Sequence, residues 1–177
     1  MSNANNGLPD HLFKYLSSIT PLINVDLIVC NPKKGFLLSW RSDEYYGPGW
    51  HIPGGIIRFK ENCIDRLNFV AKNELNLDQE LKFSLVSINQ IMNPYRDIRG
   101  HFISMLFLSY IQDLDLNNKN VKVKENGYLE WHDSMPDDII KQHKRYEKIL
   151  KTIMSNNITN LFDTGNLLEN YNPNYEQ

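Results

Sequence analysis

Apolar and polar positions along the chain follow two different periods, and each change of period marks an expected element. Positions 25–30 form an almost continuous apolar run, which is typical of a buried strand. A turn containing Pro32 and Gly35 follows, and the apolar run 36–40 then predicts the returning strand of a hairpin. Similar patterns predict further strands at 50–52, 83–91, 102–111 and 128–132.

Three segments show helical spacing instead. The clearest covers 62–76, where apolar residues recur every three or four positions, namely Ile64, Leu67, Val70, Ala71 and Leu75. A short helix is expected from Pro9 onward, with Asp10 placed to cap it and an apolar set of Leu12, Phe13, Leu16 and Ile19. A terminal helix is expected over 136–154, with inward-facing residues Ile139, Ile140, Tyr146, Ile149, Leu150 and Ile153.

These elements predict one α+β domain with a mixed β-sheet sandwiched between helices, because strands outnumber helices and hairpins recur. No internal repeat or linker divides the chain, so the domain is expected to cover 9–154. Residues 1–8 are interpreted as a disordered leader or a cloning remnant. Residues 155–177 are rich in Asn and are expected to form a loosely packed tail.

Composition narrows the class of protein. The 177 residues are 41% hydrophobic and 23% charged with a net charge of -2, which indicates a globular protein without an attraction to nucleic acid or to anionic lipid. Cys30 and Cys63 are too few for a disulfide framework or a zinc site, so a reducing, cytoplasmic location is expected. No apolar stretch approaches the ~20 residues of a membrane span.

Candidate chemistry lies in the segment 54–77. We expect Pro53, Gly54 and Gly55 to form a tight turn. Glu74 lies on the apolar side of the following helix, where either a solvated glutamate at the helix C-terminus or a ligand role explains it. Glu61 falls in the first helical turn, where either simple capping or support of a metal ligand explains it.

The same segment resembles the Nudix box, G-x5-E-x7-R-E-U-x-E-E-x-G-U, in which U is aliphatic. The matching positions are Gly55, Glu61, Ala71, Glu74 and Leu77. The sequence departs from the pattern at Phe69, Val70, Asn73 and Asn76. The strand that enters the box, 50–55, and a later Glu130-Trp131 pair also match, so that the resemblance covers roughly 12–150. It implies the Nudix fold and hydrolysis assisted by a divalent cation.

The lost glutamates resemble one branch of this family, GDP-mannose mannosyl hydrolase, which binds one Mg²⁺ and directs water to the anomeric carbon of the sugar. That resemblance implies Mg²⁺, with Mn²⁺ as an alternative, held by Glu74, by Glu125 and by a carbonyl of Gly54 or Gly55. It also implies that Arg41 clamps the diphosphate and that Asp26 contacts the substrate.

Several departures from that branch bear on the chemistry. Asn126 stands where the branch has its general base, and an amide cannot accept a proton as histidine does. Ile56 and Phe69 replace two arginines, for which Arg58 and Arg66 are the nearby substitutes. The histidines that remain as proton acceptors are His51, His101 and His132, although each also suits a structural position.

Some roles keep two interpretations. Asp26 suits either a ligand contact or an ion pair with Arg41, and Glu125 suits either a metal site or a solvated loop. The base of a nucleotide is expected to stack on one of several aromatic residues, Trp40, Tyr45, Tyr46, Trp50 or Tyr95.

Three functions are compatible with these residues. The leading one is an Mg²⁺-dependent hydrolase of a nucleoside diphosphate sugar that breaks the C–O bond. The alternatives are P–O cleavage of a nucleotide or nucleotide sugar, and a catalytically impaired module that only binds a nucleotide sugar. The expected partner is thus a small molecule, and the family resemblance implies a homodimer.

Overall fold

The computed structural model describes residues 7–43, 46–112, 114–118 and 120–155. Most of the expected leader and nearly all of the expected tail lie outside the described residues. The helices are α1 (Asp10–Ile19), α2 (Cys63–Leu75), the 3-10 helix η2 (Lys141–Tyr146) and α3 (Glu147–Met154). The strands are β1 (Leu22–Asn31), β2 (Gly35–Arg41), β3 (Gly49–His51), β4 (Gly54–Ile56), β5 (Ser84–Met92), β6 (His101–Tyr110) and β7 (Leu129–His132).

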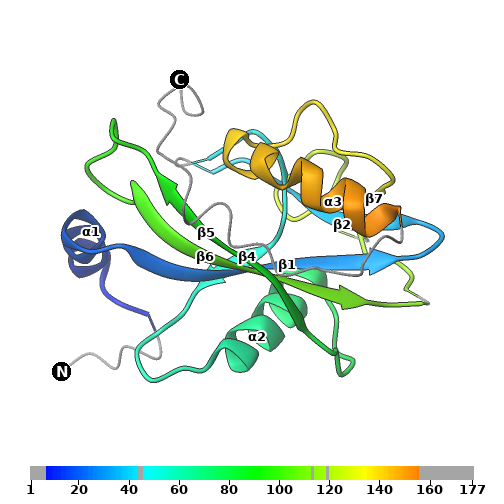
Figure 1. Cartoon of the computed structure of the whole chain (residues 1–177), viewed down its shortest axis with the longest axis horizontal. Coiled ribbons are helices and arrows are strands. Elements are labelled where there is room, and N and C mark those ends of the chain that lie inside the picture. Colours follow the sequence, from blue (N-terminus) through cyan, green and yellow to red (C-terminus); the bar gives the residue numbers. More distant parts are fainter. Residues whose placement is uncertain (1–6, 44–45, 113, 119, 156–177) are drawn as a thin grey trace.

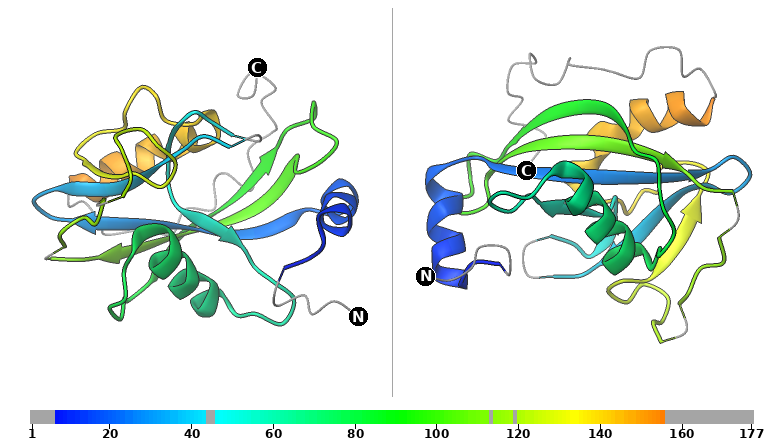
Figure 2. Two further views of the ribbon diagram at one scale, coloured as in Figure 1. Left: turned by 180° about the vertical axis from the view of Figure 1, so that it is seen from behind. Right: turned by 90° about the horizontal axis from the view of Figure 1, so that it is seen from below.

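One mixed sheet organises these elements. Its order is β3-β2-β1-β6-β5, with β4 paired to β1 and β7 paired to β2. The long pair β1 and β6 is parallel, and the other pairs are antiparallel. Helix α2 covers one face of the sheet and α3 the other, while α1 lies at one end (Figures 1 and 2). The α+β class and the sheet between helices are therefore confirmed.

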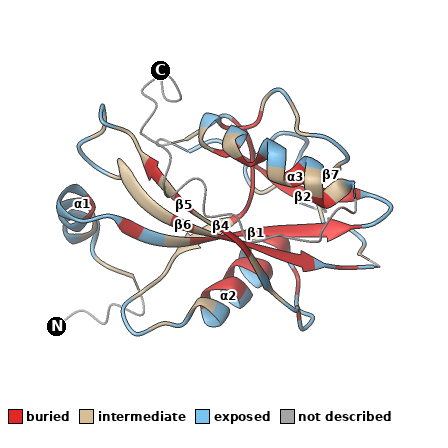
Figure 3. Cartoon of the chain, viewed as in Figure 1, coloured by how far each residue is buried: buried red, intermediate tan, exposed pale blue. Residues whose placement is uncertain are grey.

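Strand β1 is buried on both sides because it lies at the centre of the sheet (Figure 3). Val25, Leu27 and Val29 belong to the hydrophobic core under α2. Ile28 and Cys30 alternate with them and belong to the core under α3. Asp26 shares this second face, so the period of the strand places a carboxyl group inside the protein on the α3 side.

Helix α2 forms where the sequence predicts it, with well-defined ends. The Asn62 side chain accepts a hydrogen bond from the Asp65 N–H at 2.9 Å, and Asn76 ends the helix with a positive φ of 56°. Most of the expected apolar face is buried, but Ile64 is 49% exposed. Arg66 is buried on this helix instead, which the apolar spacing did not predict.

Helix α1 confirms the expected position but not the expected cap. Pro9 is the N-cap and makes no side-chain capping bond, while Asp10 pairs with Lys14 at 2.7 Å. The apolar residues Leu12, Leu16 and Ile19 are exposed to different degrees, between 37% and 60%. The position of α1 at the end of the sheet explains this exposure, because the helix covers neither face (Figure 2).

The expected terminal helix over 136–154 is wrong in its first part. Residue Ile139 forms a parallel bridge with Trp50, and the Ile140 N–H donates to the Trp50 carbonyl at 2.9 Å. These bonds extend the backbone along the edge strand β3, so helical structure begins only at Lys141. Leu150 and Ile153 of α3 are buried as expected.

The expected tight turn at Gly54 and Gly55 is also wrong. Both residues lie in β4, whose partners on β1 are Asp26 and Val25, and neither has a positive φ. Glycine is required there for space, because a Cβ on Gly55 would lie 2.9 Å from Cδ of Arg66. A Cβ on Gly54 would collide with the Asp26 carboxylate.

Candidate functional site

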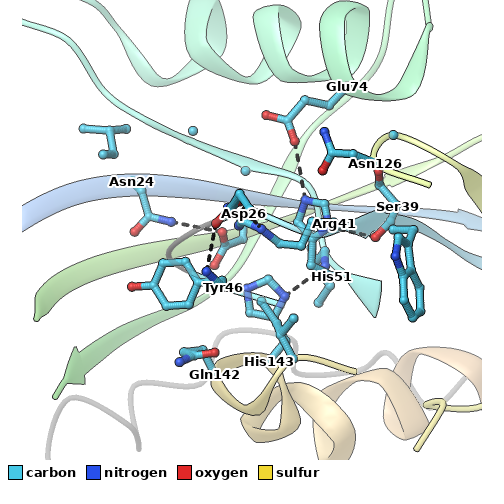
Figure 4. A pocket seen from close by; sticks show the side chains of 18 of the residues that line it. Asn24, Asp26, Ser39, Arg41, Tyr46, His51, Glu74, Asn126, Gln142 and His143 are labelled. Carbon is cyan, nitrogen blue, oxygen red and sulfur yellow. Dashed lines mark hydrogen bonds and ion pairs between the residues drawn. The ribbon is translucent and has the colours of Figure 1, made fainter. Parts of the chain in front are cut away.

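A cavity of about 590 Å³ is lined by residues of the sheet, the end of α2, the loop before β7 and the segment 140–143. This volume falls within the usual range for small-molecule sites. Residues from most of the chain line it, and Figure 4 shows many of their side chains directed inward. Those used below are Asn24, Asp26, Ser39, Trp40, Arg41, Tyr46, His51, Gly54, Gly55, Glu74, Arg99, Asn126, Gln142 and His143.

Glu74 is the residue through which α2 contributes a carboxylate to the cavity. It lies near the end of the helix, its side chain is 34% exposed, and Oε2 lies 3.7 Å from Nε2 of His51. Val70 and Ala71, one turn earlier on the same helix, are buried in the core. The helical period therefore directs Glu74 along the apolar side toward the sheet, as the sequence indicated.

His51 is the only one of the three expected histidines that lines the cavity. It is buried, and its Nδ1 lies 2.7 Å from the Ser39 carbonyl. A carbonyl can only accept, so Nδ1 carries a proton and Nε2 faces Glu74. The close approach of β2 and β3 thus fixes the orientation of the ring.

Asp26 is buried, and three side chains donate hydrogen bonds to it. Its Oδ2 accepts from the Tyr146 hydroxyl at 2.8 Å and from the Ser104 hydroxyl, and its Oδ1 accepts from the Asn24 amide at 3.0 Å. Burial raises the pKa of this carboxyl above its ordinary value, although the bonds from Ser104 and Tyr146 oppose the shift. The alternative of an ion pair with Arg41 is not what the structure shows.

Arg41 lies at the cavity with Asp43 as its partner. Its Nε donates to Asp43 Oδ2 at 2.8 Å, and its guanidinium lies 5.2 Å from the centre of the Tyr46 ring. Arg96 and Arg99 approach the same ring at 4.6 Å and 5.8 Å. Three guanidinium groups therefore lie close to one aromatic ring, and two of them, Arg41 and Arg99, line the cavity.

Glu61 has a structural partner. Its carboxylate accepts from the Arg58 N–H and pairs with Arg66 at 2.8 Å, while the Arg66 guanidinium lies 4.7 Å from the Phe69 ring centre. Burial raises the pKa of Glu61, but the bonds from Arg58 and Arg66 outweigh burial and hold it below its usual value. Arg66, one of the two arginines considered as substitutes for an arginine at 69, is thus the ion-pair partner of Glu61.

Two residues expected at the site lie elsewhere. Arg58 does not line the cavity, and its guanidinium lies 5.8 Å from the centre of the Phe69 ring. Glu125 does not line it either, because its carboxylate turns back to accept from the Lys122 N–H at 3.2 Å. The solvated-loop interpretation of Glu125 describes this position, and the neighbouring Asn126 reaches the cavity instead.

The remaining candidates lie in the structural core or at the surface. His132 packs against Trp50 at 4.7 Å between ring centres, and His101 pairs with Gln90 at 3.0 Å. Burial lowers the pKa of both histidines. Among the aromatics expected to stack a base, Trp40 and Tyr46 line the cavity, while Tyr45 lies outside the described residues.

A metal site formed by the protein alone is absent from the described part of the chain, where no three His, Cys, Asp or Glu side chains meet as ligands. Of the donors that the family resemblance implies, Gly54, Gly55 and Glu74 line the cavity, and Glu74 with the Gly54 carbonyl could hold one divalent ion. Ladder bonds join Leu27 to Pro53 and Ile57 to Ile23, so the alternation places the Gly54 carbonyl outside the β1 ladder. Mg²⁺ commonly uses one or two carboxylates and completes its shell with water and phosphate.

Two residues of the cavity, Gln142 and His143, are not indicated as site residues by any pattern in the sequence. His143 is buried, its Nδ1 accepts from the Ile52 N–H at 2.9 Å, and burial together with nearby positive charges lowers its pKa well below the usual value. Gln142 precedes it on η2. Both were assigned to a continuous terminal helix, and only the contact between positions 52 and 143 reveals their place.

Comparisons with known proteins agree with this architecture. No family model matches the chain. The low-salt glycan biosynthesis protein Agl8 of Haloferax volcanii is 27% identical over 133 residues, which cover 71% of this chain and 84% of that protein. No helix in the described ranges has the length and apolar character needed to cross a membrane.

Solved structures show the fold. The MutT protein from Methanosarcina mazei Go1 has a TM-score of 0.57 at 16% identity, over 76% of this chain and 96% of that chain. A MutT NUDIX hydrolase from Burkholderia pseudomallei has a TM-score of 0.56 at 17% identity, over 74% and 95%. A UDP-X diphosphatase has a TM-score of 0.54 at 14% identity, over 81% and 66%. The chain therefore has the Nudix fold that the segment 54–77 predicts.

Proposed function

We propose that the chain is a hydrolase of a nucleoside diphosphate sugar that acts with one divalent cation, Mg²⁺ or Mn²⁺. The observation that carries this proposal is the meeting of Glu74, Gly54 and Arg41 at one cavity of about 590 Å³. Oxygen donors suit a hard cation, and a guanidinium suits the diphosphate. The cation supplies charge to the leaving diphosphate when it is bound.

The site favours a cation shared between the protein and the ligand. Glu74 is the one carboxylate of α2 that lines the cavity, and Glu125 stays in its own loop. A single carboxylate with one carbonyl leaves most coordination positions to water and phosphate oxygens. We therefore expect weak metal binding by the protein alone and much tighter binding when a nucleotide is present.

The resemblance to GDP-mannose mannosyl hydrolase supports C–O cleavage as the leading reaction. The sugar then leaves as a free sugar, and the nucleoside diphosphate is the other product. The similarity to a protein named for glycan biosynthesis also supports a substrate that carries a sugar. Arg41 and Arg99, which lie 5.2 Å and 5.8 Å from the centre of the Tyr46 ring, hold the diphosphate in this proposal.

Each of the two other functions is supported by one specific observation. Cleavage at phosphorus is supported by the fold similarity to a UDP-X diphosphatase. A module that binds without turnover is supported by Asn126, which lines the cavity where the resemblance implies a general base. The homodimer stays a prediction, which sedimentation of the purified protein tests.

One experiment separates the three functions. Thermal-shift screening with nucleotide sugars, with and without Mg²⁺, first identifies a ligand, which at 100 times its dissociation constant adds about 2.7 kcal/mol of stability. Turnover in ¹⁸O-labelled water then locates the cleaved bond. We expect the label in the free sugar. Label in the phosphate would instead show P–O cleavage, and stable binding without products would show a binding module.

A further inference from the structure

The cavity has a polar edge that the proposed chemistry does not use. Gln142 and His143 are consecutive residues of η2, and both line the cavity. Figure 4 shows them on the opposite side of the cavity from Glu74. A ligand whose diphosphate lies near Glu74 therefore extends another of its parts toward η2.

The hydrogen-bonding state of His143 follows from its backbone partner. The Ile52 N–H donates to Nδ1 at 2.9 Å, and a backbone N–H can only donate, so Nδ1 carries the lone pair. In the neutral ring the proton must then reside on Nε2. Burial, followed by the charges of His51, Arg41 and Arg145, holds the pKa of His143 well below its usual value and keeps the ring neutral.

The Nε2 donor of His143 has no acceptor among the described residues. The ring is buried, with 8% of the residue exposed. Nε2 is not one of the fully buried polar atoms that lack a partner, so this donor is open to water or to a ligand. Since His143 lines the cavity, a bound molecule can supply the acceptor.

Gln142 adds a second neutral group beside this donor. Its backbone carbonyl accepts from the Arg145 Nε at 3.1 Å, whereas its side-chain amide makes no hydrogen bond within the described residues. An amide offers donors and an acceptor together. The side chains of Gln142 and His143 therefore present several hydrogen-bonding positions and carry no charge themselves, although Arg41 and Arg145 act on His143 from nearby.

Charge distinguishes what this edge can bind. A diphosphate is best matched by the guanidinium groups of Arg41 and Arg99 around Tyr46. Neutral donors and acceptors match hydroxyl groups, each of which donates one hydrogen bond and accepts others. We propose that Gln142 and His143 bind hydroxyl groups of the sugar and thereby help to determine which sugar is accepted. This inference rests on the proposed function.

Two substitutions separate the binding role of His143 from its structural role. His143→Asn places an amide oxygen near the position of Nδ1, so it keeps an acceptor for Ile52 but removes the distal donor. His143→Gln places an amide nitrogen near the position of Nε2, so it keeps the donor but loses the acceptor. One variant therefore keeps only the acceptor of the ring and the other keeps only its donor, at the same position in the chain.

The test is a calorimetric titration with two matched pairs of probes, GDP-mannose with GDP and UDP-glucose with UDP, in the presence of Mg²⁺. We expect His143→Asn to weaken binding of the preferred nucleotide sugar about three- to tenfold, the value of one neutral hydrogen bond, and to leave the matching diphosphate unchanged. His143→Gln should keep the affinity for the sugar nucleotide and lower the denaturation midpoint.

Other outcomes overturn the inference in distinguishable ways. If His143→Asn weakens binding of the nucleotide sugar and of the diphosphate equally, the His143 donor contacts the nucleotide and not the sugar. If it weakens neither, His143 does not contact the ligand. Binding of neither probe pair by the unmodified protein would refute the proposed function, and the assignment of a sugar site with it. A nitrogen-15 spectrum that showed the proton on Nδ1 would refute the tautomer directly.

Discussion

At the scale of single residues, the partner of each acidic group separates structural from functional roles. Glu61 is paired with Arg66 and hydrogen-bonded to the Arg58 backbone, both through Oε2, and it does not line the cavity. Glu74 faces the cavity with His51 3.7 Å away. Asp26 accepts hydrogen bonds from Asn24, Ser104 and Tyr146. Of these three carboxylates, Glu74 lines the cavity with the fewest partners of its own, and it is therefore the best placed to bind an external cation.

Replacement of Glu61 should affect stability rather than ligand binding. In Glu61→Gln the buried Arg66 loses its counter-charge, and we expect the free energy of unfolding to fall by roughly 1 to 3 kcal/mol. Urea denaturation measures this change. Glu74→Gln is the matched control, because its side chain is partly exposed and should leave the midpoint nearly unchanged. Equal destabilisation by both variants would contradict this division of roles.

The buried carboxyl of Asp26 should make stability depend on pH. Burial raises its folded-state pKa above 3.8, so the folded protein retains a proton that the unfolded chain releases. This contribution to stability is complete below the unfolded pKa and is lost as the pH rises through the folded pKa. The stability of Asp26→Asn relative to the unmodified protein should therefore increase with pH. Denaturation curves from pH 4 to 8 measure it, and a constant difference would refute the raised pKa.

The sequence identifies some of these residues and not others for a physical reason. Glu74, Asp26 and Arg41 occupy regular positions of a helix and of strands, where a period and a family pattern fix their direction. The place of His143 depends on a hydrogen bond to Ile52, 91 positions earlier in the chain. No local pattern encodes such a contact.

At the scale of elements, the ends of α2 are set by two asparagines. Asn62 caps the first turn, and Asn76 takes the left-handed conformation with a φ of 56° where the Nudix pattern has glycine. Asparagine is one of the few residues besides glycine that adopts this conformation readily. This explains why the departure at Asn76 does not change the helix.

Substitution at Asn76 should follow this conformational preference. We expect Asn76→Ala to lower the free energy of unfolding by about 1 kcal/mol, because alanine resists a positive φ. Asn76→Gly should be neutral or slightly stabilising at the same position. Thermal denaturation of both variants measures the effect. An Ala variant as stable as the Gly variant would show that the left-handed cap is absent.

A substitution in the loop before β7 tests whether a general base at position 126 would speed the reaction. Asn126 lines the cavity, and its Oδ1 accepts from the Ser42 N–H at 3.2 Å. In Asn126→His we expect faster release of the sugar, up to roughly 10²-fold, since a positioned base has at least this effect. A new titration near pH ~6.5, the unperturbed histidine value, should accompany it. Rates and pH profiles on a confirmed substrate measure both, and unchanged values would show that the loop does not reach the reacting water.

Most elements follow from hydrophobic period, and the exceptions have a common cause. The strands and α2 match their predicted positions within a few residues because each buries its own periodic face. The segment 136–140 resembles a helix by its apolar spacing, but its backbone pairs with Trp50 at the sheet edge. Gly54 and Gly55 resemble a turn, yet they pair with β1. In both cases tertiary pairing replaces the local preference.

At the scale of the whole molecule, the sheet separates two cores and leaves the cavity beside one of them. Helix α2 supplies Glu74 from one face, and η2 supplies Gln142 and His143 from the other side. A ligand in the cavity thus meets the carboxylate of Glu74 on one side and the uncharged side chains of Gln142 and His143 on the other, and Arg41 and Arg99 lie near Tyr46. This arrangement suits a molecule with a diphosphate and an uncharged sugar.

The most direct test of the central claim is a calorimetric titration of the nucleotide sugar into the unmodified protein and into Glu74→Gln, each with and without Mg²⁺. If the cation is shared between Glu74 and the diphosphate, the unmodified protein should bind the nucleotide sugar at least tenfold more tightly with Mg²⁺ than without it, a coupling of about 1.4 kcal/mol. Glu74→Gln should lose most of this difference while it keeps the Mg²⁺-independent affinity. An equal Mg²⁺ effect in both proteins, or none in either, would contradict the account.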